Sequence, residues 1–377
     1  MSNPPRANIS VGVLGVGGAG RAHIRRLRRN DHVGKIVCFD PGMPPEAPEG
    51  AVVATSREAL LEQVDAVTIC TPDHCHLDDI RASLEAGRHV LVEKPMAASL
   101  AEARQVAGIV ERHPHLVFAV HHQMREVPAF RKAAELIRSG VLGSVYYIES
   151  NYWHDMRERS AQYDNWRAEH GQSLIFGHGC HPLDLIMHLA GGAPESHATY
   201  VSKNAYAEYA AAYTSATTTM RFASGVVAKS HINSCADFPQ LNDIVVLGER
   251  ASYVDGLLFR DGKFEQVADF YTGTSGDISL NVVDIKLPMR LVSVAFKAYL
   301  GLFNWLSNRL MSRPDFGFRR YPLTVYNHDG ACQGMIDNFI AAVRGEAEVL
   351  VGLADAVRVI ELCEAAEASA LGVAPSA

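Results

Sequence analysis

A lysine and a carboxylate directly follow a short apolar run in the first quarter of the chain. The run is His89–Val92, and Glu93, Lys94 and Pro95 come after it. Such a run predicts a buried strand, and an open parallel sheet keeps its ligand crevice just beyond the carboxyl ends of its strands. We therefore expect Glu93 and Lys94 at a place where side chains can act on a bound ligand.

A glycine-rich segment precedes this lysine by roughly seventy residues, within the span of one doubly wound sheet. It follows the apolar stretch Ile9–Leu14, precedes a helix-like stretch, Arg21–Arg29, and consists of Gly15, Val16, Gly17, Gly18, Ala19 and Gly20. In a GxGxxG segment, the first glycine permits a tight turn and the second lets the backbone approach a pyrophosphate. The third lets the helix pack close to the strand. The segment predicts a dinucleotide site.

The end of the next strand indicates which dinucleotide binds. Lys35–Phe39 reads as a strand and is followed by Asp40, about twenty residues after the glycines, where a carboxylate accepts from the ribose 2′-hydroxyl. A 2′-phosphate would be repelled there, so we expect NAD, with NADP less favoured. Four arginines lie along the preceding helix, where we expect mostly a solvated face: Arg25, Arg26, Arg28 and Arg29.

Strands and helices alternate through residues 1–125. Predicted strands are Ala51–Ala54, Ala66–Cys70 and Leu116–Val120, and predicted helices run from Ser56 to Val64, from Leu77 to Glu85 and onward from a capping-box pair, Ser99 and Glu102. The pattern predicts a doubly wound parallel sheet of the α/β class, with residues 1–125 as the NAD-binding domain.

From Ser144 onward the pattern changes. Apolar and β-branched runs follow one another without helices long enough for crossovers: Val145–Trp153, Thr217–Phe222, Val226–Ile232 and Asp243–Leu247. These predict a large, mostly antiparallel open sheet with helices on one face. Two closing helices are expected at Met335–Val343 and Ala354–Ser369. We expect residues 126–377 to form a second, α+β domain that binds substrate and mediates oligomerisation.

Several motifs together resemble the Gfo/Idh/MocA family, the relatives of glucose-fructose oxidoreductase and inositol 2-dehydrogenase. The resemblance covers roughly residues 8–195. It is carried by GVGGAGRAH with Asp40, by TPDHCH from Thr71 to His76, by EAGRHV from Glu85 to Val90, by Glu93-Lys94-Pro95, by Gln123, Arg125 and Pro128, by Trp166-Arg167, and by GCHPLD from Gly179 to Asp184. The motifs are specific to the family but select no substrate.

The resemblance implies roles for the matching positions. Lys94 and His181 match the catalytic lysine and histidine, and Asp184 matches a substrate-side carboxylate. The cofactor side of the site would be formed by the glycine segment, Asp40, Thr71, Pro72, Asp73 (where the family usually has Asn), His76, Glu93, Lys94 and Gln123. Arg167 beside Trp166 is a candidate substrate clamp, although it could equally be a surface charge.

The chain departs from the family at one position. The family often has Asp four residues before the histidine, and this chain has Gly177 followed by His178. A hydride leaves a carbinol carbon only as the hydroxyl proton is removed, so a base and a cation are needed. His181 suits the first role, and Lys94 suits the second or shares the proton. We hypothesise that His178, a candidate substrate-side residue, partly replaces the aspartate, although it could simply be a packed loop histidine.

Composition narrows the class of protein. The 377 residues are 48% hydrophobic, enough for two cores, and the net charge of −7 argues against a nucleic-acid surface. The 7 cysteines show no CxxC spacing and no signal peptide opens the chain, so we expect a reduced, cytoplasmic setting. No carboxylate–histidine metal motif surrounds His178 and His181, so we expect no metal there.

One apolar segment needs a separate interpretation. Leu287–Met311 is rich in Leu, Phe, Trp and Val, but Arg290, Lys297 and Arg309 interrupt it. Its longest uncharged stretch is shorter than the roughly 20 residues a membrane span requires. We expect no membrane span and favour a helical insertion that packs on the sheet or on a neighbouring subunit, with a membrane-surface helix as the alternative.

These features together favour an NAD-dependent dehydrogenase. The resemblance implies that it acts on a secondary hydroxyl of a sugar, sugar derivative or cyclitol, and that the open sheet makes a homo-oligomer, a dimer or tetramer. Two alternatives stay open: a glycoside-processing enzyme that oxidises transiently with retained NAD, and a non-catalytic NAD-binding regulator. The sequence contains no Tyr-x-x-x-Lys pair, which disfavours short-chain dehydrogenase chemistry.

Overall fold

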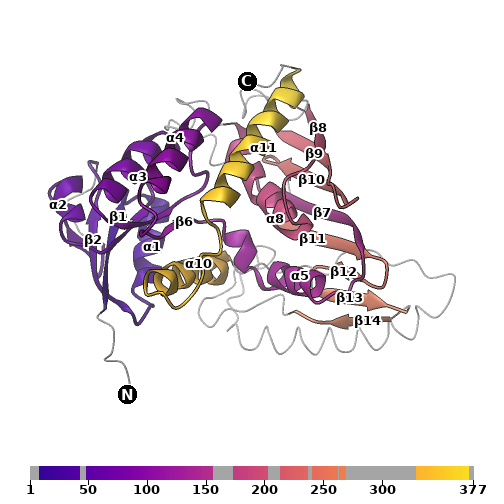
Figure 1. Ribbon diagram of the computed structural model, residues 1–377, viewed down its shortest axis with the longest axis horizontal. Coiled ribbons are helices and arrows are strands. Elements are labelled where there is room, and N and C mark those ends of the chain that lie inside the picture. Colours follow the sequence, from indigo (N-terminus) through magenta and orange to yellow (C-terminus); the bar gives the residue numbers. More distant parts are fainter. Residues whose placement is uncertain are drawn as a thin grey trace, which may run out of the picture.

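Two sheets organise the chain in the computed structural model (Figure 1). The structure describes residues 8–42, 48–155, 173–202, 213–236, 240–261, 263–268 and 328–372. The first sheet and its helices come from the N-terminal third, and the second sheet follows it in the chain. This arrangement agrees with the predicted fold class.

The first sheet has six parallel strands in the order β3-β2-β1-β4-β5-β6. Its strands are β1 (Ile9–Leu14), β2 (Val33–Phe39), β3 (Val52–Val53), β4 (Ala66–Ile69), β5 (His89–Val92) and β6 (Phe118–Val120). The helices between them are α1 (Gly18–Leu27), α2 (Arg57–Leu61), α3 (His76–Glu85) and α4 (Leu100–Glu111). Because β4 is buried at every residue, helices must cover both of its faces. The predicted doubly wound sheet is confirmed.

Side-chain caps start two of these helices as the sequence predicts. The Ser56 hydroxyl accepts from the backbone N–H of Ala59 at 3.0 Å, and the Ser99 hydroxyl accepts from that of Glu102 at 3.3 Å. The capping-box geometry is only partly reproduced, since the Glu102 carboxylate accepts from the N–H of Ala98. These caps fix where the helices enter, and hence the loops before them.

The helix after the glycine segment differs from the prediction in two ways. It begins at Gly18 and ends at Leu27, earlier at both ends than expected, because Gly17 already serves as its N-cap. Three of its arginines, Arg25, Arg28 and Arg29, are exposed as expected, but Arg26 is buried. Arg26 and Arg29 pair with Asp329, and Arg28 pairs with Glu49. The two pairs with Asp329 tie α1 to the C-terminal part of the chain.

The second sheet has eight strands in the order β14-β13-β12-β11-β7-β10-β9-β8. Neighbouring described strands pair antiparallel except β7 with β10, which run parallel. The strands are β7 (Val145–Trp153), β8 (Ser196–Ser202), β9 (Ser215–Arg221), β10 (Val227–Asn233), β11 (Leu241–Gly248), β12 (Ser252–Val254), β13 (Leu257–Arg260) and β14 (Lys263–Gln266). The predicted mostly antiparallel open sheet is confirmed.

Helices cover one face of this second sheet (Figure 1). They are α5 (Pro128–Arg138), α8 (Cys180–Ala190) and α11 (Leu353–Leu371), which contact β11, β7 and β8. Alternation along β7 explains the packing, because Ile148, Ser150 and Tyr152 are buried on the helix side. Tyr152 is thereby directed toward α8, the helix that carries His181.

The C-terminal part of the chain returns to the first sheet. Helix α10 (His328–Val343) places Ile336, Phe339 and Ile340 in one hydrophobic cluster with strand β1. The N–H of Val120, at the end of β6, donates to the carbonyl of Val351 at 3.0 Å. The two sheets are therefore joined by packing as well as by the linker, and the boundary near residue 125 stays a prediction.

The expected helical insertion at Leu287–Met311 lies outside the described residues. Within the described ranges, no helix has the length and apolar character to cross a membrane. The two closing helices predicted from the sequence are present as α10 and α11, each longer than expected at its N-terminal end.

Candidate active site

The glycine segment forms an open turn at the N-terminus of α1. Gly15 has φ +82°, and a Cβ there would lie 2.7 Å from the backbone of Cys70, so both the turn and its close approach to β4 require glycine. A Cβ on Gly20 would lie 1.9 Å from the carbonyl oxygen of Gly15. Gly17 and Gly18 are exposed and nothing lies within 4 Å of a Cβ built on them. This open backbone at a helix N-terminus fits a pyrophosphate.

Asp40 contributes to the same loop. One carboxylate oxygen accepts from the N–H of Val16 at 2.7 Å, and the other accepts from the N–H of Gly42 at 2.8 Å. Each oxygen keeps a second lone pair, so the carboxylate can still accept from a ribose hydroxyl. Ala19 is exposed beside the open glycines. The predicted cofactor residues of the first βα turn thus lie together.

The TPxxxH segment is held against the loop that carries the lysine. The two ring nitrogens of His76 lie 3.0 Å from the carbonyl oxygen of Pro95 and 2.9 Å from that of Thr71. The Thr71 hydroxyl donates to Asp79 at 2.8 Å. Pro72 leads into a short 3₁₀ turn that contains Asp73, which is buried. His76 therefore connects two of the predicted motifs.

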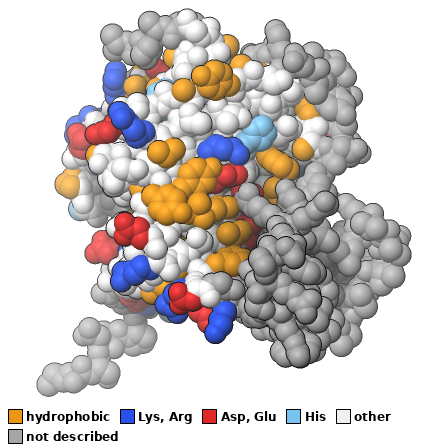
Figure 2. Space-filling model, turned by 90° about the vertical axis from the view of Figure 1, so that its right-hand side faces the viewer, with side chains coloured by type: hydrophobic (Ala, Val, Ile, Leu, Met, Phe, Trp, Pro, Cys, Tyr) orange, Lys and Arg blue, Asp and Glu red, His pale blue; other side chains and the backbone are white. Residues whose placement is uncertain are grey.

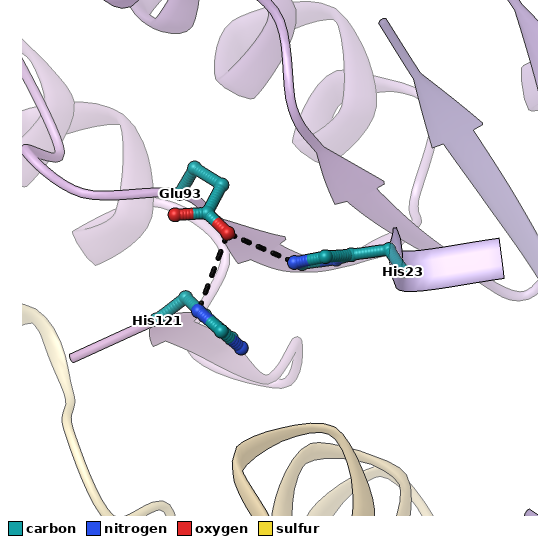
Figure 3. A group of neighbouring side chains, drawn as sticks. All are labelled: His23, Glu93 and His121. Atoms are coloured by element: carbon teal, nitrogen blue, oxygen red, sulfur yellow. Dashed lines mark hydrogen bonds and ion pairs between the residues drawn. The ribbon is translucent and has the colours of Figure 1, made fainter. Parts of the chain in front are cut away.

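Glu93 lies between two histidines from other segments of the N-terminal part of the chain (Figure 3). Its Oε1 is 2.9 Å from Nε2 of His23, on α1, and 3.3 Å from Nδ1 of His121, just after β6. Its Oε2 accepts from the backbone N–H of Lys94 at 3.3 Å. The carboxylate is mostly buried and both imidazoles are almost fully buried.

Burial and charge set the protonation of this triad. Burial alone would lower the pKa of His23, but neighbouring Cys70 and the Glu93 carboxylate raise it to about 10. Burial opposes ionisation of Glu93, yet His121, His23 and Lys94 hold its pKa well below the usual range. Burial lowers the pKa of His121 to about 3. The triad therefore carries an imidazolium, a carboxylate and a neutral imidazole.

Lys94 reaches from the first sheet to the second part of the chain. Its Nζ donates to the carbonyl oxygen of Gly177 at 2.9 Å. Gly177 lies in a π-helical turn, Ile175–Gly179, which leads directly into α8. His181 sits in the first turn of α8. The structure therefore brings the predicted lysine to the segment that carries the predicted histidine.

Aromatic rings surround His181. The ring of Tyr152 stacks on it, with centroids 5.3 Å apart and an interplanar angle of 17°. His122 meets it edge-on at 6.2 Å. His178 contacts the same Tyr152 ring at 5.6 Å and His154 at 6.2 Å. Tyr152 thus lies in contact with both histidines that the sequence singled out.

Asp184 is engaged in a buried ion pair. Its carboxylate accepts from Nε of Arg125 at 2.9 Å and from a terminal nitrogen of Arg125 at 2.6 Å, and its side chain is 1% exposed. The same arginine also donates to Asp355 and to the carbonyl of Leu350. Both oxygens of Asp184 are therefore used in holding α8 to the 3₁₀ turn that carries Arg125.

A cavity of about 210 Å³ lies beside this ion pair. Its lining includes Asp184 and Arg125 together with His188, Asp355 and Arg358. Neither Lys94 nor His181 is among the described residues that line it. We therefore do not place the reacting groups of a substrate there.

Three predicted site residues remain to be placed. Gln123 is buried in the 3₁₀ turn after β6. Trp166 and Arg167 lie outside the described residues.

Sequence reasoning missed four side chains that contact the predicted site: His23, His121, His122 and Tyr152. The pair His121-His122 carried a usable signal, because it follows a predicted strand at the same sheet edge as Lys94. Tyr152 carried none, since its role depends on which face of β7 turns toward α8.

Comparison with known proteins matches both parts of the chain. Residues 9–122 match the model of an oxidoreductase family with an NAD-binding Rossmann fold, and residues 130–254 match the Gfo/Idh/MocA C-terminal domain.

Two curated relatives match about half of the chain. One is the rhizopine catabolism protein MocA of Rhizobium meliloti, which is 28% identical over 52% of this chain and 62% of its own length. The other is a UDP-N-acetylglucosamine 3-dehydrogenase of Acidithiobacillus ferrooxidans, which is 30% identical over 50% of this chain and 56% of its own length. The chain spans about half the length of the curated relatives it matches.

A solved structure shares the fold over nearly the whole chain. The scyllo-inositol dehydrogenase of Lactobacillus casei, crystallised with NAD(H) and scyllo-inositol, superposes with a TM-score of 0.70 over 97% of each chain at 15% identity. At this identity the likeness concerns the fold.

Proposed function

Because the chain belongs to the Gfo/Idh/MocA oxidoreductase family, we propose that it transfers a hydride from a secondary hydroxyl of a sugar, sugar derivative or cyclitol to NAD. The family's first domain is an NAD-binding Rossmann fold. The substrate class rests on the relatives, which include a UDP-N-acetylglucosamine 3-dehydrogenase, and on a solved neighbour that holds an inositol.

The hydrogen bond from Lys94 to Gly177 carries the proposal. It links the edge of the cofactor sheet with the turn that precedes His181. A base and a cation are the two groups needed to remove a hydroxyl proton and to steady the developing alkoxide. Their presence at one junction, at the carboxyl edge of a dinucleotide-binding sheet, is the arrangement this chemistry requires.

We assign roles to individual residues on this basis. NAD, when bound, accepts the hydride. His181 removes the hydroxyl proton, while Lys94 donates to the oxygen and stabilises its developing charge. Tyr152 fixes the plane of the His181 ring by stacking on it, and we keep His178 as its candidate partner. Asp184 acts by holding α8 in place through Arg125, because its carboxylate is almost fully buried and both of its oxygens accept from that arginine.

The preference for NAD is supported by the glycine loop and Asp40. The 2′-phosphate of NADP would approach a carboxylate. Three of the four arginines that could have offered a phosphate site are paired with carboxylates elsewhere: Arg26, Arg28 and Arg29. Among the described residues, this leaves NAD as the form that fits Asp40 better.

We propose that the open face of the second sheet forms a homo-oligomer contact. Figure 2 shows hydrophobic side chains gathered on this side of the molecule. Tyr200 on β8 is 73% exposed and Val227 on β10 is 46% exposed. A patch of exposed apolar side chains on one face marks an interaction surface.

We keep residues 1–125 and 126–377 as the proposed domains. A reducing, cytoplasmic setting is supported by cysteines that are all free.

The decisive experiment offers a panel of sugars, sugar acids, inositols and glycosides to the protein with NAD or NADP and follows absorbance of the reduced nicotinamide. Net reduction of NAD with a polyol supports the proposal. Product formation without net reduction would indicate a glycoside-processing enzyme with retained NAD. Tight NAD binding with no turnover on any compound would favour the non-catalytic regulator.

A further inference from the structure

We infer that Glu93 is a positioning residue that fixes the backbone of Lys94 to the pyrophosphate-binding helix through His23 and His121. This inference rests on the proposed function, because it concerns the lysine assigned to that reaction. Glu93 is next to Lys94 in sequence, and its side chain points toward His23 and His121 (Figure 3).

The two oxygens of Glu93 have different partners. Oε2 accepts from the N–H of Lys94, the residue whose side chain acts. Oε1 contacts His23 at 2.9 Å and His121 at 3.3 Å. The Glu93 carboxylate therefore connects the backbone N–H of Lys94 to α1, through His23, and to the end of β6, through His121.

The position of His23 gives this connection a consequence for the cofactor. His23 lies on α1, and the N-terminus of that helix presents the open backbone of Gly17 and Gly18. A pyrophosphate bound at the N-terminus of α1 would hold this helix in position. Because His23 contacts Glu93, and Glu93 holds Lys94, the placement of the helix is transmitted to the lysine.

Stability alone does not explain such a group. Taking ionised side chains out of water is costly, and replacing a buried ion pair by well-packed apolar residues is often neutral or stabilising. His23 and His121 are 1% and 2% exposed. A buried carboxylate between two imidazoles, one residue before the acting lysine, is what a positioning role requires.

The same three side chains could in principle hold a metal ion. Their candidate ligand atoms lie within 4.8 Å of one another. However, Oε1 already lies within contact of both ring nitrogens, and Oε2 accepts from Lys94. Both oxygens of Glu93 therefore already have partners, and the positioning role needs no ion.

The test compares Glu93→Gln with Glu102→Gln, a matched removal of a carboxylate that caps α4. The proteins are first checked for equal thermal unfolding and NAD binding. The rate at which an amine-reactive reagent labels Lys94 is then measured by mass spectrometry, which needs no substrate. Turnover, KM and the pH–rate profile are measured with a confirmed substrate. His121→Asn, which keeps a donor near Oε1, serves as a second variant if Glu93→Gln does not fold.

We expect Glu93→Gln to raise the Lys94 labelling rate about threefold or more. Its kcat should fall by about 10²-fold, because displacing a reacting side chain by about 1 Å lowers the rate by about that factor. The affinity for NAD should change little. His121→Asn should show the same changes to a smaller extent, and Glu102→Gln should match the wild type in both. A wild type that turns over no polyol overturns the proposed function, but Lys94 labelling still tests the positioning role.

Two results would overturn the inference. One is wild-type labelling and kcat in a folded Glu93→Gln protein. The other is one equivalent of zinc that survives dialysis and is lost in His121→Asn, because the triad would then be a metal site.

Discussion

Lys94 and Gly177 are joined by a hydrogen bond of 2.9 Å between the lysine ammonium and a backbone carbonyl oxygen. At the position of Gly177 the family often carries an aspartate, whose carboxylate could both accept this hydrogen bond and take up a proton. A carbonyl oxygen can accept but cannot be protonated near neutral pH. The chain thus keeps the anchor for the lysine and lacks a titrating partner there.

Replacing Lys94 by alanine should lower turnover by about 10²-fold or more while NAD binding stays largely intact, because the lost cation acts mainly on the alkoxide-like transition state. Lys94→Arg keeps the charge but not the compact ammonium, and should recover only part of the rate. Steady-state kinetics together with NAD titration checks this. Near-normal turnover in Lys94→Ala would show that the lysine is not catalytic.

His181 and His178 should differ sharply when each is replaced by alanine. His181→Ala removes the proposed base and should nearly abolish turnover. His178→Ala removes a ring that contacts Tyr152, which in turn stacks on His181, so it should lower the rate less and move the acidic limb of the pH–rate profile.

The matched control for the histidine variants is Tyr152→Phe, which keeps the ring that stacks on His181 and should retain most of the activity. The pH–rate profiles of all three variants decide the roles. An active His181→Ala enzyme would remove the proposed base, and an unchanged profile for His178→Ala would remove that residue from the mechanism.

The first sheet could be predicted from sequence because each of its signals is local. These signals are the short apolar runs between helix-like stretches, the caps at Ser56 and Ser99, and the spacing of the glycines. Each of them acts within a few residues. The place of Lys94 followed from the same logic, since the end of a parallel strand marks the ligand edge of the sheet.

The contacts between distant segments could not be predicted in this way. Arg125 was recognised only as a family motif, and its bidentate pairing with Asp184, 59 residues later, depends on how α8 packs. Arg26 was expected on a solvated helix face, but it is buried and pairs with Asp329. The expectation that Asp184 faces a substrate stays a prediction, since its oxygens accept from Arg125 while the residue also lines the neighbouring cavity.

Asp40 should make NAD bind better than NADP. Its carboxylate already accepts from Val16 and Gly42 and leaves a negative charge where a 2′-phosphate would lie. Asp40→Ala should therefore weaken NAD binding and narrow the difference between the two cofactors. Titration of both cofactors by fluorescence checks this, and an equal or tighter affinity of the wild type for NADP would contradict the assignment.

The ion pair between Arg125 and Asp184 should dominate the stability of the junction. Asp184→Asn leaves a buried guanidinium without its bidentate partner, and loss of one member of a buried pair costs about 3–5 kcal/mol. Asp355→Asn, the matched control, removes a partner that is 25% exposed and should cost much less. Denaturant unfolding measures both free energies, and equal losses would refute the ranking.

Removing His121 should change how stability depends on pH. Burial lowers the pKa of His121 to about 3 in the folded chain, against 6.5 for the free side chain, with the charges of Glu93, His23 and Arg26 acting on it as well. Because the folded-state pKa is the lower one, its neutral ring contributes stability that is present above pH 6.5 and lost as the pH falls.

The neighbouring His23 acts in the opposite direction. Its pKa is raised to about 10, so its contribution is complete below pH 6.5 and lost as the pH rises toward 10. Acidification from neutrality therefore tests His121 without a loss from His23.

The quantity to measure is the free energy of unfolding of wild type and His121→Asn at pH 6.5 and pH 5. The wild type loses about 2 kcal/mol through this histidine over that interval, at about 1.4 kcal/mol for each pH unit, and the variant does not. The stability gap between the two proteins should therefore narrow by about 2 kcal/mol.

His122 is buried with a lowered pKa as well, but it is present in both proteins and cancels in the difference. His115→Asn, at an exposed histidine, is the control. A gap that stays constant would mean that His121 is protonated in the folded chain, and the charge assignment of the triad would then be wrong.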